Sequence, residues 1–149
     1  MPQLSMHSPV GDLTISEDGG AIVSLDWGWG AIQTDTPLLL KAKDQLEHYF
    51  DGDRSKFALP LIPRGTPYQQ KVWAAMRRIP YGRTATYGEL AKSLDSAARA
   101  VGRSCGQNPL PILIPCHRVV GADGKLGGYS GDGGLETKTA LLRLEGAWL

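Results

Sequence analysis

A proline-rich stretch near the middle of the chain constrains the fold most. The stretch Leu59–Pro67 holds three of the ten prolines in the chain. Each proline fixes its own backbone φ and removes one backbone N–H donor, which is typical of a linker. We predict that this stretch divides the 149 residues into an N-terminal domain, residues 1–63, and a C-terminal domain, residues 64–149.

The two predicted domains carry opposite net charges. Residues 1–63 contain four Lys and Arg against nine Asp and Glu, a net charge of −5, while residues 64–149 contain twelve against six, a net charge of +6. The C-terminal domain is therefore the one suited to bind a polyanion. The alternative is that the two domains simply attract each other.

The N-terminal domain is predicted to form a β-hairpin followed by a helix. Apolar and polar residues alternate over residues 13–27, and Asp18-Gly19 supplies a turn. The pair Thr36-Pro37 is a helix start, and apolar residues then follow a 3.6-residue period to Phe50. Nothing in this pattern indicates a catalytic site.

The C-terminal domain is predicted to be mainly helical. The sequences TPYQ and TYGE are capping boxes that begin helices over 66–78 and 86–93. A third helix follows almost at once and ends near Cys105, with Asp95 or Ser96 as its N-cap.

The last two predicted helices have the pattern of a helix-turn-helix. They are short and closely spaced, and the second is rich in small residues and carries Arg99 and Arg103. Small side chains allow a helix to approach a DNA backbone. Short helix pairs are also common packing units, so this pattern alone does not decide between DNA binding and packing.

The segment NPLPILIPCHRVV is the strongest candidate for chemistry. A lone cysteine in an apolar run is usually inert core, but here Cys116 is followed by His117 and Arg118. A reactive cysteine needs a base and a positive environment, which these two residues can supply. A third group must orient the base, and either Glu136 or Glu145 could do so.

Several other classes of protein are disfavoured. Two cysteines, Cys105 and Cys116, do not make a disulfide framework in a chain of this length, and the chain has no CxxC pair, so we expect neither a disulfide nor a metal. No apolar run is long enough to span a membrane, and the start MPQLSMHSPVGDL lacks a secretion signal. We therefore expect a cytoplasmic protein with reduced thiols.

Five segments, TYGELA, ARAVG, QNPLPILIPCHRVVG, GGYSG and LLRLEG, resemble in their order the O6-alkylguanine-DNA alkyltransferase family, also called methylated-DNA–protein-cysteine methyltransferases. The resemblance covers Gly65–Gly146, and the preceding part is similar to the family's variable N-terminal domain only in outline. It implies an α+β fold: a small α/β N-terminal lobe, then a mainly helical C-terminal lobe with a helix-turn-helix and the active-site cysteine.

The resemblance also implies the function. It implies repair of double-stranded alkylated DNA by a single-turnover, or suicide, transfer of a methyl or larger alkyl group from O6-alkylguanine. Repair of O4-alkylthymine stays open. The expected protein is a monomer that needs no cofactor, with cooperative assembly on DNA left open.

Four catalytic roles follow from the matched positions. Cys116 would accept the alkyl group, and His117 would deprotonate it through a bridging water. Glu145 would hold the imidazole, and Tyr87 would donate to the guanine ring as the base leaves.

Five further positions match the family's DNA- and substrate-binding residues. Arg99 would fill the space left by the flipped nucleotide, with its helix in the minor groove. Val119 would offer its backbone carbonyl to the guanine amino group, and Tyr129 and Ser130 would cover the flipped base. Asn108 would fix the turn that leads to the cysteine, a structural role within the same set.

Two functions from other classes stay open at this point. A non-catalytic, alkyltransferase-like lesion-binding protein would resemble this chain but would carry tryptophan in place of Cys116. A thiol hydrolase built from Cys116, His117 and Glu145 would turn over, although such enzymes usually take these residues from distant segments.

Overall fold

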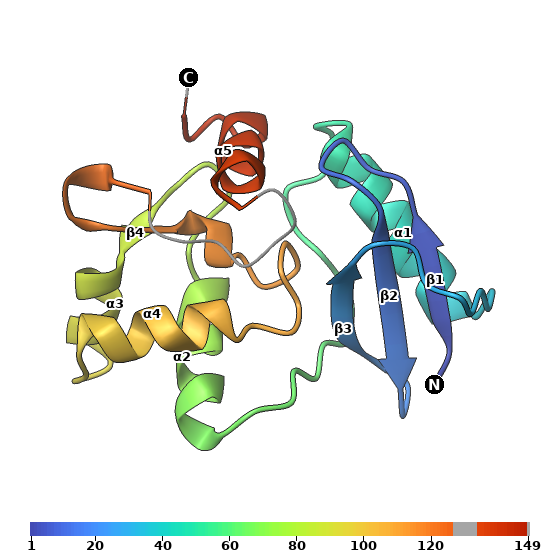
Figure 1. Ribbon diagram of the computed structural model, residues 1–149, viewed down its shortest axis with the longest axis horizontal. Helices are drawn as coiled ribbons and strands as arrows, with labels where there is room; N and C mark the ends of the chain where they lie inside the picture. The colour runs from blue at the N-terminus through green and yellow to red at the C-terminus, as the bar shows by residue number, and fades with distance from the viewer. Residues whose placement is uncertain (127–133, 149) are drawn as a thin grey trace. The chain divides into compact units, whose positions relative to one another are not determined.

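The computed structural model describes residues 1–126 and 134–148 (Figure 1). The chain divides into two compact units, Met1–Arg64 and Gly65–Leu149, which are called unit 1 and unit 2 below. Unit 1 contains a small sheet and one helix, and unit 2 is mainly helical, which confirms the predicted α+β class. None of the described helices is long and apolar enough to cross a membrane.

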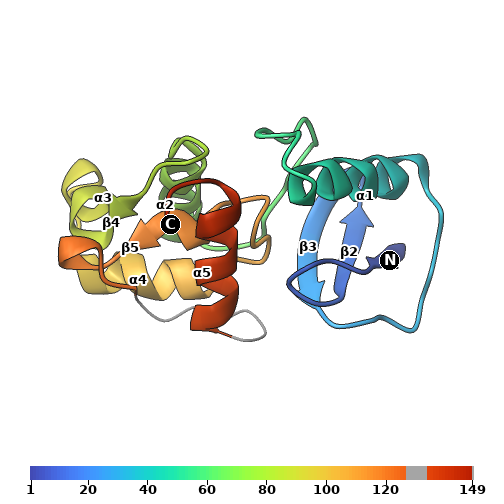
Figure 2. The ribbon, with the colours of Figure 1, turned by 90° about the horizontal axis from the view of Figure 1, so that it is seen from above.

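Unit 1 is a three-stranded antiparallel sheet with one helix packed on it (Figure 2). Its elements are β1 Gln3–Met6, β2 Leu13–Asp18, β3 Ala21–Trp27 and α1 Pro37–Phe50. Strands β2 and β3 form the predicted hairpin, with Ile15 opposite Leu25. Helix α1 begins after its N-cap Thr36, as predicted. Strand β1, which pairs with β2, was not predicted.

Both faces of this sheet are covered. Leu13 and Ile15 are fully buried on the side of α1, where side chains of the strands and the helix form the core. On the other side, Ser5 and Thr14 bond to each other at 2.8 Å, and the backbone N–H of Gly30 donates to both hydroxyl oxygens. The loop after β3 therefore satisfies the polar groups that alternate with the core residues.

The prediction that all of Leu59–Pro67 is a linker is wrong for its first half. Leu61 forms a parallel bridge with Ile22 of β3, and Ile22 N–H donates to the Pro60 carbonyl at 2.8 Å. This half extends the sheet of unit 1, because a proline still accepts hydrogen bonds through its carbonyl and an edge position needs few donors.

In its described residues, unit 2 contains four α-helices and a short parallel strand pair (Figure 2). Helix α2 packs against α3 and α4, α3 packs against α4, and α5 packs against η1. The elements are α2 Pro67–Arg77, β4 Ala85–Thr86, α3 Tyr87–Ser93, α4 Ala98–Gly106, the 3-10 turn η1 Cys116–Arg118, β5 Val119–Val120, η2 Ala122–Gly124 and α5 Leu135–Leu144. Both predicted capping boxes are present, at Thr66 and Thr86.

The predicted N-cap of α4 is wrong. Asp95 has φ 52° and lies one residue past the C-cap of α3, where its N–H donates to the Lys92 carbonyl and the Ser96 N–H donates to the Ala91 carbonyl. This pattern is a Schellman motif, in which aspartate takes the left-handed position that glycine usually holds. The N-cap of α4 is Ala97, which makes no side-chain capping bond.

Candidate active site

A tightly bonded loop positions Cys116 after α4. The Asn108 side chain donates to the Ile114 carbonyl at 2.8 Å and accepts from the Leu110 N–H at 2.9 Å. The Cys116 N–H then donates to the Ile114 carbonyl at 2.8 Å, across Pro115 with φ −79° and ψ 68°. These values define an inverse γ-turn, which suits the fixed φ of proline. The loop therefore determines where the cysteine backbone lies.

One residue of this loop is in a rare backbone conformation. Ile112 has φ 73° and is 1% exposed. A β-branched residue in the left-handed region is strained and persists only where its surroundings fix it. The bonds of Asn108 on either side of Ile112 supply that restraint.

Cys116 begins the 3-10 turn η1 and is buried, with 6% of its surface exposed. The chain continues into β5, where Val119 pairs with Ala85 and Val120 with Thr86 in parallel. Tyr87 directly follows β4, so this strand pair brings the start of α3 close to the cysteine segment.

His117 and Arg118, which directly follow the cysteine, form a buried cluster with Glu145. His117 Nε2 lies 2.7 Å from Glu145 Oε2, and both side chains are 0% exposed. Arg118 donates from Nε to Glu145 Oε1 at 2.8 Å and from a terminal nitrogen to Oε2 at 3.0 Å. Of the two carboxylates considered for orienting the histidine, Glu145 lies at the imidazole, whereas Glu136 is exposed in the first turn of α5.

This cluster determines the protonation state and the tautomer of the His117 imidazole. Burial lowers the pKa of His117, and the Arg118 and Lys138 cations lower it further, while the bond to Glu145 acts in the opposite direction. Glu145 accepts the proton on Nε2, so the lone pair of a neutral ring lies on Nδ1. Nδ1 is buried and has no hydrogen-bond partner among the described residues. This nitrogen is therefore a base held in one tautomer.

Lys138 is a second cation at the site. It is 1% exposed, and its Nζ donates to the Val119 carbonyl at 2.6 Å and lies 5.7 Å from the centre of the Tyr87 ring. Burial lowers its pKa, and its electrostatic interaction with Cys116 and Cys105 opposes that shift. A buried ammonium near the Cys116 thiol favours the thiolate form.

Tyr87 and Cys105 remain protonated at neutral pH. Burial, followed by the charges of Cys105 and Cys116, raises the pKa of Tyr87 to about 12. Burial also raises the pKa of Cys105 to about 12, and its thiol donates to the sulfur of Met76 at 3.3 Å. Tyr87 is thus a hydrogen-bond donor, and Cys105 is a packing residue rather than a nucleophile.

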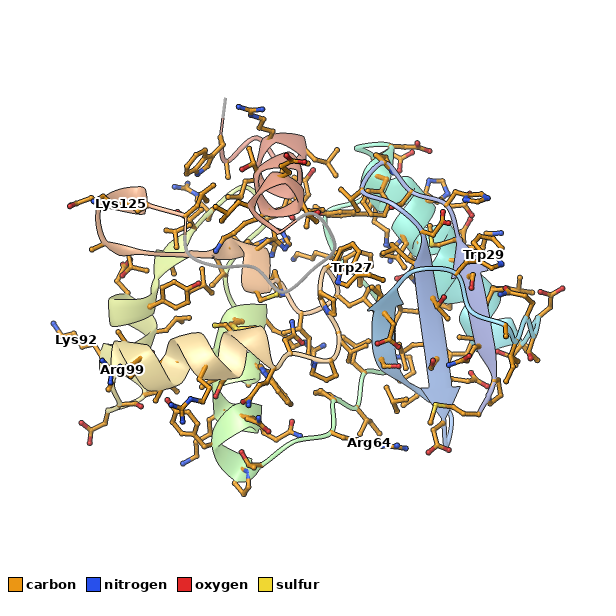
Figure 3. The ribbon with its side chains drawn as sticks, in the orientation of Figure 1. Trp27, Trp29, Arg64, Lys92, Arg99 and Lys125 are labelled. Atoms are coloured by element: carbon orange, nitrogen blue, oxygen red, sulfur yellow. The ribbon has the colours of Figure 1, made fainter. Side chains whose placement is uncertain are left out.

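The predicted helix-turn-helix is formed by α3 and α4. Figure 3 shows Lys92 and Arg99 at the turn between these helices, with side chains that extend outward. Both residues and Arg103 are exposed. Three cations outnumber the exposed carboxylates of Glu89 and Asp95 on these helices and their turn. The surface is separate from the buried cluster, so it can contact a polyanion without disturbing the thiol.

The structure therefore groups the predicted site residues in three places. His117 and Glu145 belong to the buried cluster and Cys116 directly precedes it in the chain, while Lys138 contacts both Val119 and Tyr87. Arg99 lies on the exposed surface, and Asn108 lies in the loop before the cysteine. Tyr129 and Ser130 lie outside the described residues.

The sequence did not predict the contacts of two buried cations at the site, Lys138 and Arg118. Lys138 was missed, although it lies seven residues before Glu145 and shares a helix face with the buried Leu141 and Leu142. That spacing was a signal that this lysine points inward. Arg118 was noted beside the cysteine, but its partner Glu145 comes from the other end of unit 2, and no local pattern links them.

No group of three His, Cys, Asp or Glu side chains that could hold a metal ion occurs within residues 1–126 and 134–148. A buried thiol, a neutral histidine held by a carboxylate and a buried lysine are groups that can activate a cysteine as a nucleophile. Together with the helix-turn-helix, they define a class of protein that carries a nucleophilic cysteine beside a DNA-binding motif.

Comparisons with known proteins agree with this class. Residues 67–147 match the family description "6-O-methylguanine DNA methyltransferase, DNA binding domain", and residues 4–63 match its "ribonuclease-like domain". The chain belongs to the O6-methylguanine DNA methyltransferase family. This result confirms the resemblance found in the sequence.

Individual relatives are similar over nearly the whole chain. The constitutive methylated-DNA–protein-cysteine methyltransferase of Bacillus subtilis is 44% identical, covering 93% of this chain and 92% of the relative. The methyltransferase of Methanosarcina acetivorans is 41% identical, covering 95% and 96%. The crystal structure of Mycobacterium tuberculosis OGT in complex with DNA is 42% identical, with a TM-score of 0.89, covering 99% of this chain and 94% of that chain.

Proposed function

We propose that this protein repairs alkylated double-stranded DNA by transferring a methyl or larger alkyl group from O6 of guanine to the sulfur of Cys116, once per protein molecule. The observation that carries the proposal is the buried bond between His117 and Glu145 next to the cysteine. The family and its relatives, named for methyl transfer to cysteine, support the same reaction.

The transfer proceeds by in-line displacement at the alkyl carbon. The Cys116 thiol gives its proton, through a water, to His117 Nδ1, and Glu145 stabilises the imidazolium that forms. The sulfur forms a bond to the carbon while the bond from that carbon to O6 breaks. Guanine leaves with the electron pair and takes up a proton, so a thiol and an alkylated guanine become a thioether and guanine.

Two neighbouring groups support the reacting atoms. Tyr87 keeps its proton, because its pKa is raised to about 12, and donates to the guanine ring as negative charge develops. Lys138 supports the thiolate and holds the Val119 carbonyl, which offers its second lone pair to the guanine amino group. No cofactor takes part.

The lesion reaches the buried thiol by base flipping. In the proposed complex, helix α4 lies in the minor groove. The exposed Arg99 enters the stack in place of the nucleotide, offsetting part of the extrusion cost of a few kcal/mol. Asn108 acts structurally through the loop that holds the cysteine. Tyr129 and Ser130 are proposed to cover the flipped base on the basis of the sequence resemblance.

A titration tests the single-use mechanism. Duplex DNA with one O6-methylguanine is incubated with increasing amounts of protein until repair stops. The expected plateau equals one lesion per active molecule, because a thioether is not hydrolysed, and Cys116→Ala should repair nothing while Cys105→Ala reaches the same plateau. Repair beyond one equivalent would mean a turnover enzyme, and lesion binding without repair would mean a non-catalytic lesion-binding protein.

A further inference from the structure

Arg118 has no part in the transfer described above, yet its side chain contacts Glu145, Ile79 and Tyr81. Its side chain is 8% exposed, and its guanidinium donates twice to Glu145 and once to the Ile79 carbonyl, at 2.7 Å. It also lies 5.8 Å from the centre of the Tyr81 ring. Two hydrogen bonds from one guanidinium fix the plane of a carboxylate more firmly than a single contact does.

Glu145 is shared between this arginine and the histidine. Its Oε2 accepts from both His117 and Arg118, while Oε1 accepts from Arg118. A buried carboxylate bonded only to an imidazole would draw a proton onto the ring, because an isolated buried charge is costly. Here the guanidinium already balances the negative charge, so the ring need not be charged.

We propose that Arg118 is a positioning residue of the acceptor site, which fixes and neutralises Glu145 so that His117 rests uncharged with Nδ1 available for the Cys116 proton. The inference rests on the proposed function, since it assigns to His117 the role of a base. An imidazole that was protonated at rest could not take a proton from the thiol.

The charges around the imidazole determine the expected effect of removing Arg118. Glu145 faces it from the end of α5, Lys138 from the same helix, and Arg118 and Cys116 from η1. Burial is the main cause of the lowered His117 pKa, and both cations add to it. Without Arg118, the Glu145 charge is no longer compensated, so the proton affinity of His117 must rise.

Nuclear magnetic resonance of the imidazole nitrogens tests the proposal without DNA. The chain has three histidines, and His7 and His48 are exposed, so single substitutions of these two assign the His117 signal. The unmodified protein should show a neutral ring protonated on Nε2 at pH 7. Arg118→Met should raise the His117 pKa by about one unit, a tenfold gain in proton affinity.

Two controls separate charge from structure. Arg77→Met removes an exposed arginine at the end of α2 and should leave the His117 pKa unchanged. Arg118→Lys keeps the positive charge and should raise the His117 pKa less than Arg118→Met. The acid limb of the rate of methyl transfer from free O6-methylguanine should move to higher pH in Arg118→Met, in step with the His117 pKa.

Several results would overturn the proposal. A protonated His117 at pH 7 in the unmodified protein would do so, as would equal His117 pKa values in that protein and Arg118→Met. If Arg118→Met does not fold, Arg118→Gln, which removes the charge but keeps hydrogen-bond donors toward Glu145, takes its place. The His117 pKa must then be higher in Arg118→Gln than in the unmodified protein, and equal values contradict the proposal. Failure of methyl transfer in the unmodified protein would instead refute the proposed function and leave this measurement intact.

Discussion

Replacing Glu145 by glutamine should damage both stability and transfer. Glutamine keeps the shape of the side chain but removes its charge and one of its two acceptor atoms. Its amide N–H group would then face the N–H groups of His117 and Arg118, which now share Oε2. Both partners are almost fully buried, so the arginine would lose its counter-charge where water cannot replace it.

The burial of Glu145 and its partners determines how much stability and transfer rate Glu145→Gln should lose. Breaking a buried ion pair from one side costs about 3–5 kcal/mol, which corresponds to a fall in Tm of about 10 °C or more in a chain of this size. Transfer should slow about 10²–10⁴-fold, because the base loses the group that fixes its tautomer and stabilises its charged form. Urea denaturation measures the free energy of unfolding, and a single-turnover assay on duplex DNA with O6-methylguanine measures the rate.

Glu136→Gln is the matched control on the same helix. Glu136 is exposed in the first turn of α5, so its loss should change the free energy of unfolding by less than about 1 kcal/mol and leave the transfer rate unchanged. If Glu145→Gln matched the unmodified protein in both assays, or if Glu136→Gln slowed transfer instead, the assignment of the orienting carboxylate would be refuted.

Three further predictions concern other parts of the chain. Arg99→Ala should slow repair in duplex DNA about tenfold or more but leave transfer from the free base unchanged, with Arg103→Ala as a surface comparison; equal losses on both substrates would remove the role in base flipping. Asp95→Gly should raise the free energy of unfolding by about 0.5–1 kcal/mol in urea denaturation, since glycine adopts φ 52° without strain, and a similar gain for Asp95→Ala would argue against this geometry. Stability should fall as pH drops from about 6.5 to 5, because the lowered His117 pKa means that the unfolded chain binds more protons than the folded protein. The slope is at most about 1.4 kcal/mol per pH unit, and His117→Gln should flatten it. An unchanged slope in His117→Gln would contradict a neutral buried ring.

Local signals in the sequence predicted local structure well. The capping boxes at Thr66 and Thr86 depend on residues three positions apart, and both helices begin where these pairs indicate. The N-cap prediction at Asp95 was wrong because aspartate is suited both to an N-cap and to a left-handed C′ position. The Schellman bonds of α3 use it in the second way, and no residue within the turn reveals that choice.

Contacts between distant segments could not be predicted in the same way. The pairing of Leu61 with Ile22 depends on how the chain returns to the edge of β3, which proline content alone does not indicate. The choice between Glu136 and Glu145 depended on which carboxylate the end of α5 brings to His117. Within the residue pattern alone both were acceptable, and only the family resemblance favoured Glu145.

The proposed function requires that Cys116 itself receives the alkyl group. The most direct test is the intact mass of the protein after incubation with excess duplex DNA containing O6-methylguanine, followed by peptide mapping. The proposed function predicts a gain of one methylene mass per chain, found on Cys116 and never exceeding one. A gain on Cys105, or loss of the lesion with no change in protein mass, would contradict it.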